Sequence, residues 1–133
     1  MKIVVDTNVV ISGVFFGGFP QKILKAIVDK KIVACATTEI IEEYEEIVAE
    51  MIKRKQGSLN HNLLAPLVNT MEIIISSSVV KLCRDPDDDK FLNCAKDANA
   101  FYIVSGDKDL LVLQEFENIK IITAKEFYEL YLC

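Results

Sequence analysis

The chain has 133 residues, of which 51% are hydrophobic and 26% are charged, and its formal net charge is −5. This size and composition predict one globular domain and argue against a disordered chain. The acidic balance argues against a protein that holds nucleic acid on a broad basic face. Because the first apolar run is broken by Asp6 and Asn8, and no later run could span a bilayer, we expect no signal peptide, no membrane contact and a cytoplasmic location.

Short apolar runs and helical stripes then alternate along the chain. In order, we expect a strand at 2–5, a flexible glycine-containing connection at 13–18, a helix from Pro20 to Lys31 and a strand at 32–36. There follow a long helix capped by Thr37 or Thr38 and ended by residues 53–57, a helix near 60–71, and a third strand within 73–75 or 79–82. The last elements are a helix from 87 to about 99, a strand at 102–105, a short helix through 110–113, a strand at 120–123 and a final helix capped by Thr123. This alternation predicts a parallel sheet between helical layers.

Cysteine and histidine are too scattered to suggest a zinc site. The four cysteines show no CxxC spacing, and the only histidine, His61, lies far from each of them. We expect reduced thiols and a surface histidine, which leaves no basis for a Ser/His/Asp triad.

Two aspartates come directly after predicted strands. Asp6 follows the strand at 2–5, and Asp107 follows Gly106 at the end of the strand at 102–105, with Asp109 two residues further on. A lone Gly-Asp pair is usually only a turn. Ligands, however, gather at the carboxyl ends of parallel strands, so two such aspartates together favour a shared site.

Helical angle separates the inward carboxylates from the solvated ones. At about 100° per residue, Asp88 falls within the apolar stripe of the helix from 87, Asp87 lies at its margin and Asp89 points away. The whole acidic run equally fits the simple capping of a helix start. In the long helix, Glu43 and Glu45 border the apolar stripe on opposite sides, and geometry alone does not choose between them.

Carboxylates that are held close together repel one another. One of them takes up a proton unless a cation neutralises the group. Because the candidate ligands are all oxygens, Mg²⁺ or Mn²⁺ is the cation expected.

Four blocks of the chain resemble the PIN domain, a metal-dependent ribonuclease family, and in particular the VapC-like toxins of toxin–antitoxin systems. They stand in the family's order, and they are Val4–Ser12, Thr38–Tyr44, Asp85–Leu92 and Tyr102–Leu111. The resemblance implies a single PIN domain over residues 1–133, folded as a three-layer α/β/α sandwich whose parallel sheet has about five strands in the order 3-2-1-4-5. It also implies that Asp6 and Asp107 lie beside each other.

The resemblance further assigns the site residues. It selects Glu43 over Glu45, and it implies that the catalytic and metal-binding residues are Asp6, Glu43, Asp88 and Asp107. Asn8 would support the site by orienting Asp6 or a water molecule, and Asp109 would have a supporting role. The triplet of aspartates leaves the third acid open by one residue, to Asp87 or Asp89.

The function implied is metal-dependent endoribonuclease cleavage of single-stranded RNA by water activated by Mg²⁺ or Mn²⁺. The partners implied are the RNA substrate, a small antitoxin protein and a second copy in a homodimer or higher oligomer. One alternative is a PIN fold that serves only as a binding or scaffold module. Another is a Mg²⁺-dependent hydrolase of small phosphates, for which Lys108 is the one candidate lysine beside the acids.

Overall fold

The strands form one six-stranded sheet in the order β3-β2-β1-β4-β6-β5. The computed structural model describes residues 1–55 and 60–133. All neighbouring strands are parallel except β5 and β6, which are antiparallel. The strands are β1 Lys2–Val5, β2 Val33–Ala36, β3 Glu72–Ile73, β4 Tyr102–Val104, β5 Glu115–Phe116 and β6 Ile119–Ile122. The predicted order is confirmed, with β6 as its fifth parallel strand.

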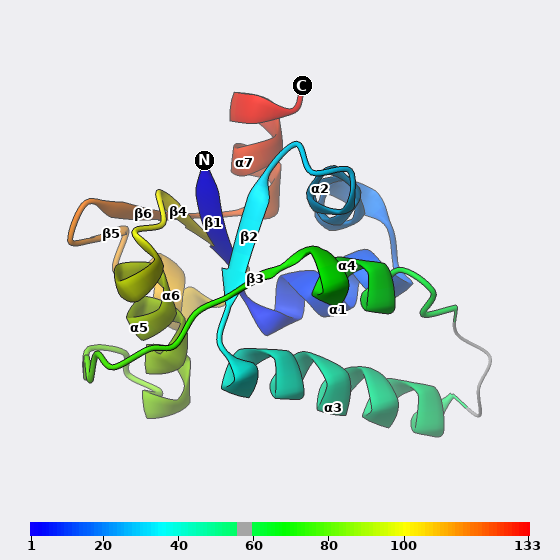
Figure 1. Cartoon of the computed structure of the whole chain (residues 1–133), viewed down its shortest axis with the longest axis horizontal. Coiled ribbons are helices and arrows are strands. Elements are labelled where there is room, and N and C mark those ends of the chain that lie inside the picture. Colours follow the sequence, from blue (N-terminus) through cyan, green and yellow to red (C-terminus); the bar gives the residue numbers. More distant parts are fainter. Residues whose placement is uncertain (56–59) are drawn as a thin grey trace.

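Helices cover both faces of this sheet and so complete the predicted three layers (Figure 1). The helices are α1 Thr7–Phe15, α2 Gly18–Val28, α3 Thr38–Arg54, α4 Leu64–Thr70, the 3₁₀ helix η1 Pro86–Asp88, α5 Asp89–Ala98, α6 Lys108–Leu111 and α7 Ala124–Tyr131. In Figure 1, α5 and α2 lie on opposite sides of the strands, and α3 starts at the carboxyl end of β2. Two predicted caps are present: the Thr37 side chain accepts from the Ile40 amide, and Thr123 forms a capping box with Glu126.

The core lies between the sheet and these helices. Ile3, Val4 and Val5 of β1 are fully buried, as expected for a central parallel strand that is covered on both faces. The hydroxyl of the buried Tyr44 donates a hydrogen bond to the Val5 carbonyl, which ties α3 to the end of β1. None of the helices in the described parts of the chain is long and apolar enough to cross a membrane.

The predicted flexible connection at 13–18 is wrong. Residues 7–15 form α1, and Gly13 is buried inside that helix against α2. The glycine allows close approach of the two helices, a role that its sequence context does not separate from that of a loop glycine. Among the glycines of the described residues, Gly17 and Gly18 have the left-handed backbone that favours glycine, with φ of 82° and 69°.

Substitution of Gly13 by Ala is expected to destabilise the fold by about 1–3 kcal/mol, because the added methyl group overpacks a closed contact. A Cβ at this position would lie 2.5 Å from Leu24 Cδ1 and 3.0 Å from the backbone carbon of Pro20. Gly106→Ala is the matched control, since no atom lies within 4 Å of its added Cβ. Urea denaturation of both variants checks the difference, and equal stability would contradict the packing described.

Residues 79–82 do not form the alternative third strand, and β3 lies at Glu72–Ile73 instead. The segment from 76 to 83 is held by side chains of α5 that are spaced one turn apart. Asp97 accepts hydrogen bonds from Ser76, Ser77 and Ser78, Asn93 accepts from the Val80 amide, and Asp89 accepts from the amides of Leu82 and Cys83. These contacts replace the backbone ladder of a strand. The predicted helix stop at 53–57 lies partly outside the described residues.

Candidate metal centre

Two strand ends meet at the carboxyl edge of the sheet. Val5 of β1 pairs with Val104 of β4, so Asp6 and Ser105 follow on adjacent strands. The Ser105 hydroxyl donates to Asp6 Oδ2 at 2.7 Å, and the Asp107 amide donates to the same hydroxyl oxygen at 2.9 Å. Ser105 therefore links the two aspartates and fixes how they lie relative to each other.

Asp6 is buried, with 3% of its surface exposed. Burial raises the pKa of Asp6 to about 6, the Ser105 hydrogen bond opposes this shift, and the negative charge of Asp107 adds to it. A buried carboxylate next to a second one is costly to ionise, so this corner of the sheet favours a positive charge.

Asp107 also belongs to a group of three carboxylates, together with Asp88 and Asp109. One oxygen from each of Asp88, Asp107 and Asp109 can be chosen so that all three lie within 4.8 Å of one another. Asp107 caps α6 by accepting from the Asp109 amide at 2.9 Å, which explains why the two side chains converge. Asp109 also forms an ion pair at 2.6 Å with Arg84, whose side chain is 84% exposed and therefore weakly held.

Asp88 is the least satisfied member of this group. Only 8% of its surface is exposed, and its buried Oδ2 has no hydrogen-bond partner among the described residues. The pKa of Asp88 is raised to about 7, and burial is the largest cause. The Asp107 carboxylate is the next cause, and the charges of Asp6 and Asp85 also raise this pKa. Buried polar atoms are normally paired, so this oxygen calls for an explanation.

A divalent cation fits these residues. Carboxylate oxygens are the ligands that Mg²⁺ and Mn²⁺ prefer. An ion among them would pair the Asp88 oxygen that has no partner in the described structure, and its charge would offset the burial and the repulsion that raise the pKa values of Asp6 and Asp88. The residues that could hold it are Asp88, Asp107 and Asp109, with Asp6 adjoining them through Ser105.

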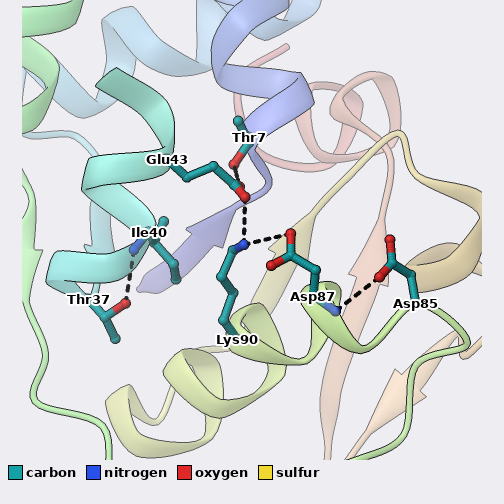
Figure 2. A network of polar contacts seen from close by, with 7 residues as sticks. All are labelled: Thr7, Thr37, Ile40, Glu43, Asp85, Asp87 and Lys90. Carbon is teal, nitrogen blue, oxygen red and sulfur yellow. Dashed lines mark hydrogen bonds and ion pairs between the residues drawn. The ribbon is translucent and has the colours of Figure 1, made fainter. Parts of the chain in front are cut away.

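Glu43 lies in a different environment, at the side of the centre that faces α3. Its Oε1 accepts from the Lys90 ammonium at 2.5 Å, and its Oε2 accepts from the Thr7 hydroxyl (Figure 2). Lys90 also binds Asp87 Oδ2 at 2.9 Å. Burial acts to lower the pKa of Lys90, but the hydrogen bonds and charges of Glu43 and Asp87 outweigh it and raise that pKa.

The remaining predicted site residues are placed as follows. Asn8 is exposed and makes no hydrogen bond to Asp6 within the described ranges 1–55 and 60–133. Asp89 is not solvated: it is buried beneath residues 82–83, whose amides lower its pKa even though burial acts in the opposite direction. Asp87 is exposed and points to Lys90 rather than into the three-aspartate group, and Glu45 is exposed.

Sequence reasoning missed the side chains that contact the predicted acids, among them Thr7, Ser105, Arg84 and Lys90. The spacing of Asp87 and Lys90, one turn apart on a helix, was a usable signal for their ion pair. Lys90 and Glu43 are 47 positions apart in the sequence, so their contact depends on the packing of α5 against the rest of the fold.

Comparison with known proteins agrees with this picture. A family model described as PIN domain matches residues 2–109 of the chain. An uncharacterized protein of Methanocaldococcus jannaschii, MJ1680, is 34% identical over 142 residues, which cover 97% of this chain and 90% of that protein. No solved structure matches the chain.

Proposed function

The chain belongs to the PIN domain family, a nuclease superfamily, and from this premise we propose that it is a metal-dependent endoribonuclease that cleaves single-stranded RNA. The single observation that carries the proposal is the buried Asp88 oxygen, which has no partner among residues 1–55 and 60–133 and lies within a group of three carboxylates. Such an arrangement is unfavourable in the absence of a cation.

In this proposal Mg²⁺ or Mn²⁺ is held by Asp88, Asp107 and Asp109. Asp6 borders the centre at the end of β1. The bound ion would supply an activated water and stabilise the charge that develops on the phosphodiester. The two hydrogen bonds of Ser105 fix the positions of Asp6 and Asp107 relative to each other. Asn8 and Glu43 remain predicted members of the site, and Glu43 acts through the contacts that it makes with Thr7 and Lys90.

A groove beside the centre supports access by an extended polymer. It has a volume of about 610 Å³ and is lined by residues 79–83, by Asp87 of η1 and by the start of α5, including Lys90. Arg84 stands next to it, with an exposed guanidinium that could meet a phosphate oxygen. The net charge of −5 makes such local cations important for an RNA substrate.

The direct test is incubation of the purified chain with an end-labelled single-stranded RNA in the presence of Mn²⁺, Mg²⁺ or EDTA. We expect internal cleavage with either ion, none with EDTA, and much slower cleavage of the same RNA in a duplex. Intact RNA under all conditions, together with measured Mn²⁺ binding, would favour a binding or scaffold module instead.

We also propose that residues 1–133 form one cytoplasmic PIN domain that acts as the toxin of a toxin–antitoxin pair, binds a small antitoxin protein and assembles as a homodimer or higher oligomer. The match to residues 2–109 and the packing of Phe19 of α2 against Tyr128 of α7, with ring centroids 5.0 Å apart, support the single domain. The toxin role and its partners follow from the resemblance alone. Growth arrest on induced expression, relieved by Asp88→Asn, is the result expected of a toxin.

A further inference from the structure

Lys90 is a buried cation inside an acidic site. Its side chain is 10% exposed, and its ammonium lies between Glu43 of α3 and Asp87 of η1 (Figure 2). Lysine is rarely buried to this extent unless it is paired, and here two carboxylates pair it. Lys90 is therefore a fixed part of the centre and not a surface side chain that happens to lie near it.

The contacts of Lys90 divide the acids into two groups. At about 100° per residue, the side chains at positions 88 and 90 point about 200° apart around the start of α5. Asp88 therefore faces the end of β4, and Lys90 faces α3. On the β4 side, Asp88 has an oxygen without a partner among the described residues. On the α3 side, both oxygens of Glu43 are engaged, one by Lys90 and one by Thr7. The first group has only the exposed Arg84, which pairs with Asp109, whereas the second group holds the largely buried Lys90.

A second dication at Glu43 would meet this ammonium directly. Glu43 Oε1 lies 2.5 Å from Lys90 Nζ, so an ion bound to that oxygen would stand within a few ångströms of a like charge. An ion beside Asp87 would meet the same ammonium, which is 2.9 Å from that carboxylate.

We propose that Lys90 takes the place of a second metal ion: the centre binds one divalent cation on the Asp88, Asp107 and Asp109 side, and the ammonium supplies the positive charge on the Glu43 side. This inference rests on the proposed metal centre and goes beyond it, because it fixes the number of ions. It also makes Glu43 the residue that positions Lys90, not a ligand of the bound ion.

The test counts Mn²⁺ ions bound per chain at saturation, near neutral pH, from the electron paramagnetic resonance signal of the free ion. The natural chain is expected to bind one ion and Lys90→Met to bind two, because the variant frees Glu43 and Asp87 as ligands. Lys96→Met is the matched control. Lys96 lies further along α5 and pairs with Glu117 at 3.3 Å, and this variant is expected to bind one ion. The double variant Lys90→Met, Glu43→Gln should return to one.

Two ions on the natural chain, or one ion on Lys90→Met, would overturn the inference and leave the metal centre standing. Absence of binding by the natural chain would overturn the metal centre and the inference together. If circular dichroism shows that Lys90→Met does not fold, Glu43→Gln alone tests the inference. We expect this variant to bind one ion at saturation, and loss of that ion would show that Glu43 is a ligand.

Discussion

Asp88→Asn is expected to lower the rate of RNA cleavage by at least about 10³-fold, which corresponds to about 4 kcal/mol of lost transition-state stabilisation. The substitution keeps the size of the side chain but removes the charge of the one carboxylate whose buried oxygen lacks a partner in the described structure. Single-turnover cleavage of the labelled RNA, at saturating Mn²⁺, measures the loss.

The same variant separates a metal ligand from a structural residue. Because an unpartnered buried acid is replaced by a neutral amide, the metal-free protein should keep its Tm or gain a few degrees, while the increase in Tm on adding Mn²⁺ should vanish. Asp29→Asn makes the same chemical change at an exposed position after α2 and should behave as the natural chain. Full activity in Asp88→Asn would remove Asp88 from the centre.

The metal-free protein is expected to lose stability as the pH rises from about 4 to about 8. The pKa of Asp6 is raised from 3.8 to about 6 and that of Asp88 from 3.8 to about 7. The folded state therefore binds these protons more tightly than the unfolded chain does. The resulting stability is complete below the unfolded pKa and is lost as the pH rises through the folded values. At about 1.4 kcal/mol for each tenfold change in proton affinity, these two shifts set an upper limit of roughly 7 kcal/mol. We expect a smaller decrease in the free energy of unfolding, because Asp6 and Asp88 act on each other.

Urea denaturation in EDTA across this range measures the effect. Asp97, whose pKa is lowered to about 2 by hydrogen bonds from Ser76 and Ser78, changes its contribution only below the window and does not mask the trend. Asp88→Asn should flatten the profile. Saturating Mn²⁺ should reverse its slope, because the ligands must be deprotonated to bind. A metal-free profile that rises from acid to neutral pH would contradict the electrostatics described for Asp6 and Asp88.

Much of the fold and part of the site were open to prediction from local pattern. Apolar runs bounded by turn residues located β1, β2, β4 and β6, and the threonine caps located the starts of α3 and α7. Helical angle placed Asp88 toward the protein, and the strand-end positions of Asp6 and Asp107 brought them to one edge of the sheet.

The features that were missed depend on contacts between distant segments. The sequence context of Gly13 is typical of a loop, and only the packing of α2 shows its role. Residues 79–82 have the pattern of a strand, and only the structure shows that α5 supplies their hydrogen-bond acceptors. Lys108 was the lysine expected beside the acids, yet it is exposed, and Lys90 contacts Glu43 instead. The sequence shows that a lysine follows three aspartates, but only the packing of α5 shows which way it points.

The most direct test of the metal centre is the anomalous diffraction of crystals soaked in Mn²⁺. We predict one strong peak bounded by the side chains of Asp88, Asp107 and Asp109, with Lys90 still on Glu43. A peak elsewhere on the chain, with these three carboxylates unoccupied and turned apart, would contradict the account.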